Sequence, residues 1–500
     1  MLFGNADRGI GRGEVAESRI EAPFLAAFML FCAMVLLLVH LRFQHYALTV
    51  ALAVTMIAFG ATVVRVDLGV AILVVVMLMA PEIDLAGKAT SEHTLNIRYD
   101  DVLIVVIFFG VLVKTAFDGR GAFWRPNPLN GPIVLHYLVC IMATLLAVRA
   151  NLGAWDRRNA FFVILKMAEY YMVFLLTANA LNTLRDVRRQ LTLFFAVAAF
   201  LSLYAMISAE PGERIGTPFQ PQGPEPNTMG GYLIVVMSVA IGLMTQAPHW
   251  RQRALFLALM MSAFLPFLFT LSRASYFGAL VAFVTLGALG RKWYLLAAVA
   301  LTLALSPVIM PEAVKERVNY TFQRGEGEPI VIAGRPTGLQ VDKSTYERIY
   351  VWEKVKFILH VAPWFGGGVG WGKILDSQYA RVIMETGLIG LAAFVFLQWR
   401  LFRTCRETYR WSRVWMARGL GLGMAAATAG LVAHSFGTIS FLIVRIMEPY
   451  WLLMALVVVA RAAAIEDYAR QLQARRRAQA ASANRERPAA NNRSAPAPAN

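Results

Sequence analysis

The sequence predicts an all-α polytopic integral membrane protein with about 12–14 transmembrane helices and one large extracytoplasmic loop. Of its 500 residues, 58% are hydrophobic, and the mean hydropathy is +0.54. Only 16% are charged, whereas soluble proteins carry roughly a quarter. Apolar stretches of about 17–21 residues recur along the chain, and each can cross a hydrocarbon core of roughly 30 Å as a helix.

The apolar runs define the elements in chain order. Residues 1–22 mix Arg and Glu and lack a cleavable signal pattern, so we expect a cytoplasmic segment followed by an uncleaved anchor. The segment 23–310 then holds transmembrane helices 1–11, and 383–462 holds the C-terminal transmembrane helices. The expected spans are 23–41, 46–64, 68–83, 101–118, 131–149, 160–181, 190–208, 229–245, 254–271, 274–290, 293–310, 383–400, 415–434 and 441–461.

The formal net charge of +17 does not indicate a nucleic-acid partner, because its excess gathers beside the spans and in the tail. Such clusters set topology by remaining cytoplasmic. Fourteen spans with this pattern place both termini in the cytoplasm. The clusters are Arg400, Arg403, Arg406, Arg410, Arg413 and Arg418, and in the tail Arg470, Arg475, Arg476, Arg477, Arg485, Arg487 and Arg493.

Two segments outside the spans differ in character. The loop 311–382 is expected on the extracytoplasmic side, and loops of that length escape the charge rule. The tail 463–500 is basic and rich in Ala and Pro, and we expect it to be disordered in the cytoplasm, although 463–480 can extend the last helix. The three cysteines, Cys32, Cys140 and Cys405, show no disulfide framework and no metal-ligand spacing.

The stretch from Tyr346 to Gly390 is the long polar, aromatic-rich interruption in which we expect the chemistry. From Arg348 to His360 the pattern predicts a helix with Trp352, Val355 and Leu359 on its apolar stripe, lying along the membrane surface. Pro363 ends that helix. The glycines from 366 to 372, which include Gly368 and Gly370, permit tight turns and close approach to a bulky ligand.

Three arginines are expected on the extracytoplasmic side, against the charge trend. Arg214 lies in a Pro/Glu-rich connection that ends at Pro226-Asn227, Arg273 follows Ser272 in a tight turn, and Arg348 lies in the large loop. A guanidinium binds phosphate bidentately and stays charged, which suits a lipid-linked diphosphate. Each arginine alone is better explained as a residue that extends to the membrane rim, but their shared side and setting favour a function.

Asp376 precedes the next span, where it can accept a proton from a sugar hydroxyl or simply cap the helix. Within the spans, Lys166 with Glu169 and Arg445 with Glu448 form i,i+3 pairs, for which structural pairing is at least as good an explanation as function. For His434 we expect a satisfied packing role rather than a proton carrier.

These residues resemble the superfamily of O-antigen ligases and Wzy-type polymerases. Four islands within roughly 210–395 carry the resemblance, in order. They are the arginine loop ending in Pro226-Asn227; Leu271-Ser272-Arg273-Ala274-Ser275-Tyr276; Arg348, Trp352 and Pro363 through Gly370; and Asp376, Tyr379 and Glu385-Thr386-Gly387-Leu388-Ile389-Gly390.

The resemblance implies an inverting, metal-independent glycosyltransferase of the bacterial inner membrane that needs no cofactor. Such enzymes move glycans from a polyprenyl diphosphate carrier, on the outer side of that membrane, to an acceptor sugar. By resemblance, Arg273, Arg348 and Asp376 are the catalytic residues. Substrate binding falls to Arg214, Asn227, Tyr379, Trp352, Gly368 and Gly370.

We therefore predict a polysaccharide polymerase that joins carrier-linked repeat units of O-antigen, exopolysaccharide or capsule, with membrane lipid and chain-length or export proteins as partners. The family's ligases have His where this chain has Asp376, which favours the polymerase branch. The repeated Arg-x10-Gly spacing of strict O-antigen polymerases is absent: Glu225 follows Arg214 and Leu359 follows Arg348 at that distance. The alternatives are a ligase that transfers glycan to lipid A core or protein, and a transporter or flippase of lipid-linked glycans.

Overall fold

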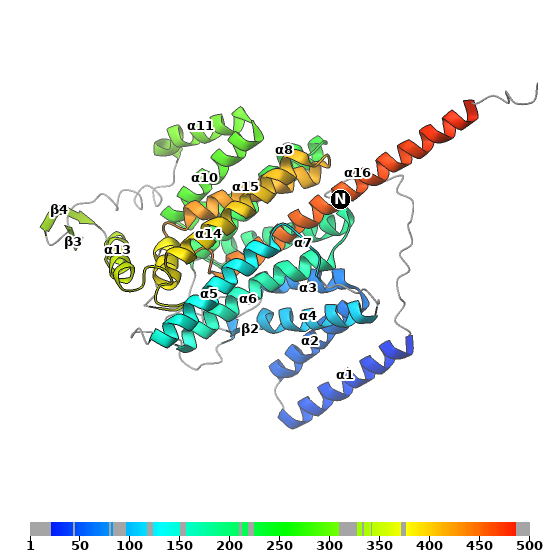
Figure 1. Cartoon of the computed structure of the whole chain (residues 1–500), viewed down its shortest axis with the longest axis horizontal. Helices are drawn as coiled ribbons and strands as arrows, with labels where there is room; N and C mark the ends of the chain where they lie inside the picture. The colour runs from blue at the N-terminus through cyan, green and yellow to red at the C-terminus, as the bar shows by residue number, and fades with distance from the viewer. Residues whose placement is uncertain are drawn as a thin grey trace, which may run out of the picture.

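The computed structural model describes residues 22–43, 46–79, 82–83, 97–117, 124–150, 157–209, 213–218, 225–309, 328–332, 335–341, 343–371 and 377–486. Helices dominate these segments (Figure 1). Every predicted span overlaps a helix, because each apolar run is continuous. The helices are α1 (Ala22–Phe43), α2 (Tyr46–Val64), α3 (Val66–Met79), α4 (Tyr99–Phe117), α5 (Asn130–Ala150), α6 (Arg157–Ala180), α7 (Leu184–Ile207), α8 (Pro226–Gln246), α9 (Trp250–Phe269), α10 (Arg273–Gly290), α11 (Trp293–Ile309), α13 (Lys343–Val361), α14 (Gln378–Trp411), α15 (Trp415–His434) and α16 (Val444–Glu486).

Eight helical segments among the described residues are long and apolar enough to cross a membrane, so the protein is a polytopic helical membrane protein. The larger total of about 12–14 spans remains a prediction. The eight segments are Asn130–Ala150, Asn159–Ala180, Leu184–Ile207, Pro226–Gln246, Trp250–Phe269, Arg273–Gly290, Gln378–Trp411 and Trp415–His434.

The centre of the bundle is formed by α8 and α15. Of the most apolar window of each, 89% and 83% is buried, against 28% for α9. Their backbones meet directly, because a Cβ on Gly242 would lie 2.5 Å from the Gly419 carbonyl oxygen, and one on Gly423 would lie 2.6 Å from Val239 Cα. Small residues of this kind let membrane helices approach closely.

The strands are confined to two antiparallel hairpins within the described residues. β1 (Glu82–Ile83) pairs with β2 (Ile97–Arg98), which leads directly into α4. β3 (Glu328–Ile332) pairs with β4 (Arg335–Val341) and precedes α13, so the predicted large loop 311–382 contains a hairpin and a helix. In Figure 1, β3, β4 and α13 lie to one side of the helical bundle.

The helix α13 agrees with the helix expected from Arg348, but its buried stripe differs from the prediction. Val351, Val355 and Ile358 pack against α14, whereas Trp352 is 45% exposed. Val355 and Leu359 of the predicted stripe do contact this cluster, so Trp352 is the one predicted stripe residue that lies off the buried side.

The C-terminal helix is longer than predicted. α16 continues to Glu486 and extends well beyond the other helices (Figure 1). Residues 463–480 extend the last helix, which the sequence analysis allowed, and the expected disorder is wrong for 481–486, because the segment is rich in Ala, Arg and Gln, which have high helix propensity. Residues 487–500 lie outside the described part of the chain.

Candidate functional site

Two of the predicted site residues, Arg273 and Arg214, lie at the turn between α9 and α10. Ser272 caps α10, because its Oγ accepts the backbone N–H of Ser275 at 3.2 Å. Leu271, just before it, has a φ of 49°, a left-handed conformation uncommon for a residue with a side chain. Arg273 is thereby fixed as the first residue of α10, half-buried.

Arg214 lies against the same turn. Its Nε donates to the Thr270 carbonyl oxygen at 3.0 Å, and its Nη2 donates to that of Leu271 at 3.3 Å. The backbone N–H of Ile215 donates to the Phe269 carbonyl at 2.9 Å, which aligns the segment 213–218 with the turn. The structure thus brings Arg214 and Arg273 onto adjoining segments.

A buried chain of hydrogen bonds connects this turn to α15. Ser272 Oγ donates to Asn227 Oδ1 at 2.7 Å, and Ser275 Oγ donates to Ser272 Oγ at 2.8 Å. The hydroxyl hydrogens of both serines are then used, so His434 Nε2–H donates to Ser275 Oγ at 3.1 Å and its Nδ1 accepts from Ser440 Oγ at 2.8 Å. Both ring nitrogens of His434 are satisfied, in line with the packing role predicted for it.

This chain also shows which segments share one end of the bundle. The start of α8 at Asn227, the α9–α10 turn and the end of α15 at His434 are joined through it. We call this the Asn227 end.

The predicted glycine stretch folds onto a break in α14. Gly387 has φ 65° and ψ −162°, which interrupts the helical hydrogen bonds from the carbonyls of Met384 and Glu385. Those carbonyls instead accept the N–H groups of Gly367 and Gly368, each at 2.8 Å. In return, the N–H groups of Leu388 and Ile389 donate to the carbonyls of Pro363 and Trp364, at 2.9 Å and 3.2 Å.

Irregular backbone at membrane depth is tolerated only where protein satisfies its polar groups, and this exchange satisfies both sides. Glycine is required because the chains are in contact. A Cβ on Gly366, where φ is +64°, would lie 2.6 Å from the Met384 carbonyl oxygen. Gly387 is equally constrained, because a Cβ there would overlap the backbone of Trp364.

A buried ion pair holds the far end of the glycine loop. Glu385 Oε1 accepts from Arg381 Nε at 2.8 Å and from the backbone N–H of Gly370 at 3.0 Å. The neighbouring Val369 N–H donates to Thr144 Oγ1 of α5 at 3.2 Å. Arg381 and Glu385 also line a cavity of about 40 Å³ between α5, α6, α14 and α16. A cavity of this size holds a few water molecules rather than a sugar.

The other predicted site residues are placed less centrally. Tyr379 donates its hydroxyl to the Val432 carbonyl at 2.6 Å and its ring packs on Phe436, so it joins α14 to α15. Trp352 is exposed on α13. The backbone of Arg348 lies in α13, but its side chain is outside the described part. Asp376 falls outside the described residues altogether.

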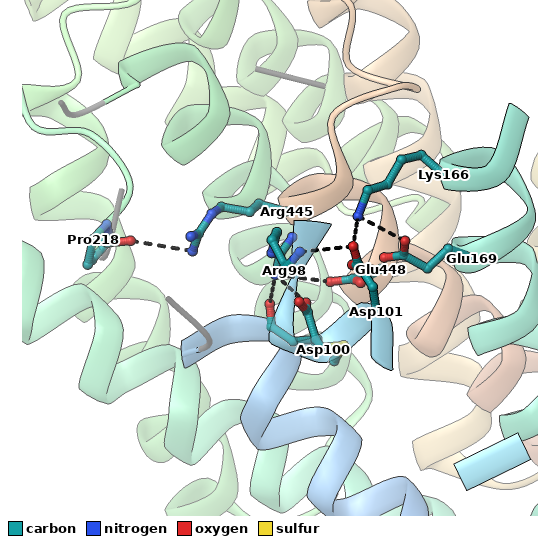
Figure 2. A network of polar contacts seen from close by, with 9 residues as sticks. Arg98, Asp100, Asp101, Lys166, Glu169, Pro218, Arg445 and Glu448 are labelled. Carbon is teal, nitrogen blue, oxygen red and sulfur yellow. Dashed lines mark hydrogen bonds and ion pairs between the residues drawn. The ribbon is translucent and has the colours of Figure 1, made fainter. Parts of the chain in front are cut away.

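A second polar centre lies among β2, α4, α6 and α16 (Figure 2). Arg98 Nη2 pairs closely with Asp100 Oδ2, contacts Glu448 Oε2 at 3.5 Å and donates to the Met77 carbonyl oxygen at 2.8 Å. Lys166 Nζ pairs closely with Asp101 Oδ2 and with Glu169 Oε2 at 3.0 Å. Arg445 Nη1 donates to the Pro218 carbonyl at 3.4 Å. We call the seven charged residues Arg98, Asp100, Asp101, Lys166, Glu169, Arg445 and Glu448 the ion network.

Arg98, which precedes α4, is almost fully buried. Burial by itself lowers the pKa of its guanidinium, but the carboxylates around it raise that pKa by more, so its net shift is upward and it stays a cation. One oxygen each of Asp100, Asp101 and Glu448 lie within 4.8 Å of one another, the spacing of a metal site. The ammonium of Lys166 and the guanidinium of Arg98 already pair with these carboxylates, which disfavours a further divalent cation there.

Only part of this network is predictable from the sequence. The i,i+3 pair Lys166–Glu169 is present, whereas Glu448 contacts Arg98 from a distant segment. Arg98, Asp100 and Asp101 were missed because they stand at the edge of a predicted span, where charged residues are ordinary. The sequence does contain an indication of them: later spans carry Lys166 and Glu448 inside apolar runs, and these buried charges need partners such as the charged residues at the start of α4.

Comparison with known proteins adds no relative. No family model matches the chain, and no curated protein matches it. The likeness to O-antigen ligases and Wzy-type polymerases therefore rests on the motif residues described above.

Proposed function

We propose that the protein is a membrane polysaccharide polymerase, an inverting glycosyltransferase that joins oligosaccharide repeat units carried on polyprenyl diphosphate. The observation that carries the proposal is the contact of Arg214 with the turn that presents Arg273. Two of the three arginines predicted for the diphosphate thus lie on adjoining segments of the Asn227 end. That end would face the extracytoplasmic side, where the carrier presents the glycan.

In the proposed reaction, a hydroxyl oxygen of the acceptor sugar attacks the anomeric carbon of the donor. The bond from that carbon to the diphosphate oxygen breaks with inversion, and the polyprenyl diphosphate leaves as an anion. Arg214, Arg273 and Arg348 would stabilise the negative charge that develops on the leaving group. The hydroxyl proton passes to a base, for which Asp376 is the proposed residue. The reaction class implies no metal or cofactor.

The remaining predicted residues take supporting roles in this proposal. Asn227, whose Oδ1 is held by Ser272, would offer its amide N–H groups to the diphosphate. Gly368 and Gly370 shape the loop that follows α13, the helix of the exposed Trp352, and packs against α14. Tyr379 would act by holding α14 against α15 rather than by touching substrate.

Arginine replacement tests the proposal. In a strain lacking the gene, Arg273→Ala and Arg214→Ala should each reduce long polymer about 10²-fold or more, the scale of losing one charge-stabilising donor. The matched control is Arg253→Ala, because Arg253 Nε also donates to a backbone carbonyl, that of Ala247 at 2.8 Å, at the opposite end of α8. Polymer should be unaffected in that variant. Wild-type polymer from Arg273→Ala, at equal amounts of protein in the membrane, contradicts the proposal.

A flippase of lipid-linked glycans is the second candidate, because two observations favour it. Buried ionisable residues in a membrane bundle often mark an ion pathway, and the ion network is of this kind. Transporters also use discontinuous helices such as α14, which is interrupted at Gly387.

A further inference from the structure

The ion network carries an imbalance of charge within the bundle. It contains four carboxylates, those of Asp100, Asp101, Glu169 and Glu448, and three cations, those of Arg98, Lys166 and Arg445 (Figure 2). Among the described residues, one negative charge is therefore in excess. An uncompensated charge away from water is costly, and a carboxyl group in that position usually takes up a proton instead.

The contacts identify the carboxyl group with the least compensation. Asp100 pairs closely with Arg98, and Asp101 pairs closely with Lys166. Glu169 lies 3.0 Å from the same ammonium. Glu448 has the longest of these contacts, 3.5 Å to an Arg98 Nη2 that already serves Asp100 and the Met77 carbonyl. The side chain of Glu448 is fully buried.

The groups around Glu448 come from each side of the network. β2 supplies Arg98, α4 supplies Asp100 and Asp101, and α6 supplies Lys166 and Glu169. α3 contributes the Met77 carbonyl, and α16 itself contributes Arg445, three residues before Glu448.

The network as a whole is short of hydrogen-bond partners. One oxygen of each of its four carboxylates, Oε1 of Glu448 included, is buried without a hydrogen-bond partner in the described structure, as are Nε and Nη1 of Arg98. Asp100 and Glu448 also each place an oxygen within 4.8 Å of the other. A pair of carboxylates has acceptors only, whereas a proton on one of them supplies the missing donor.

We propose that Glu448 holds a proton at neutral pH and that the ion network is a proton-binding site within the bundle. The proton removes the excess negative charge and leaves Arg98 to pair with Asp100. This inference concerns the network alone and does not depend on the proposed glycosyl transfer.

The protonation of Glu448 can be tested directly by infrared spectroscopy. The purified full-length protein is measured in detergent, with choline as the only buffer cation. Exposed carboxylates are ionised at pH 7.5, because their ordinary pKa lies near 4. We expect a C=O stretching band of a carboxylic acid in the wild type, which disappears in Glu448→Gln and persists in Glu407→Gln. Glu407 is the matched control, because it bridges Arg403 and Arg461 in a partly exposed site.

Thermal unfolding supplies the second readout. Glutamine mimics protonated Glu448, so Glu448→Gln should melt within a few degrees of the wild type, whereas Asp100→Asn should melt many degrees lower because Arg98 loses its close partner. The folded wild type binds one more proton than the unfolded chain, so its stability should fall as the pH rises, and Glu448→Gln should lose that slope.

Three results would overturn the assignment. One is an acid band that survives in Glu448→Gln. Another is failure of Glu448→Gln to fold, since an isostere of the protonated group should be tolerated. The third is loss of the wild-type band when NaCl replaces choline chloride, which would assign the site to a metal cation instead.

Discussion

Glu385 contacts the glycine loop through both its side chain and its backbone carbonyl. Its side chain accepts from Arg381 and from the Gly370 N–H, and its backbone carbonyl accepts from Gly368. Arg381 and Glu385 are both buried. In such a pair, removal of one partner leaves the other charge without compensation, which costs far more than the loss of a surface ion pair.

Glu385→Ala should therefore lower the free energy of unfolding by about 3–5 kcal/mol. The control is Glu353→Ala, which removes an exposed pair with Lys356 at 2.8 Å and should cost less than about 1 kcal/mol. Denaturant unfolding in detergent measures both. Equal effects of the two substitutions would show that the Arg381–Glu385 pair is not the anchor of the loop.

At the scale of elements, α14 and the glycine loop form one unit. The break at Gly387 opens two positions of the helical ladder, and the loop 363–368 fills both. Neither segment can adopt its shape alone, because each would leave backbone groups unsatisfied in an apolar surrounding. The glycine loop is therefore held by the helix that follows it in the sequence.

Gly387→Ala should weaken the contact between α14 and the glycine loop. A left-handed residue with a side chain costs about 1–2 kcal/mol, and the added Cβ also overlaps the backbone of Trp364. We expect a lower melting temperature and faster proteolysis within the loop. Gly131→Ala is the control, because a Cβ there meets nothing within 4 Å and alanine favours the helix. A Gly387→Ala protein as stable as the control would contradict the account of the break.

At the scale of the whole molecule, much of the arrangement follows from hydropathy. The apolar runs predicted the positions of the bundle helices, although α7, α14 and α16 extend beyond the predicted bounds, and the Ser-Arg turn and the α13 helix were also anticipated. The break at Gly387 was not, because a glycine within an apolar run is compatible with a continuous helix, and only its contact with Trp364 forces φ to be positive. The ion network was missed for a similar reason: Arg98 and Glu448 are 350 positions apart, and no local spacing joins them.

The segment 213–218 contacts both the ion network and the α9–α10 turn. Arg445 of the ion network donates to Pro218, and Arg214 in the same segment binds the α9–α10 turn. The start of α14 and the start of α10 both meet α15 near its end, through Tyr379 with Val432 and through Ser275 with His434.

Analysis of the glycans from a strain lacking the gene tests the proposed polymerase most directly. The account predicts single repeat units that accumulate on polyprenyl diphosphate at the extracytoplasmic face, with long polymer absent. Long polymer that remains on its carrier and is missing from its final acceptor would contradict the account and indicate a ligase. Repeat units retained on the cytoplasmic face would contradict it in favour of a flippase.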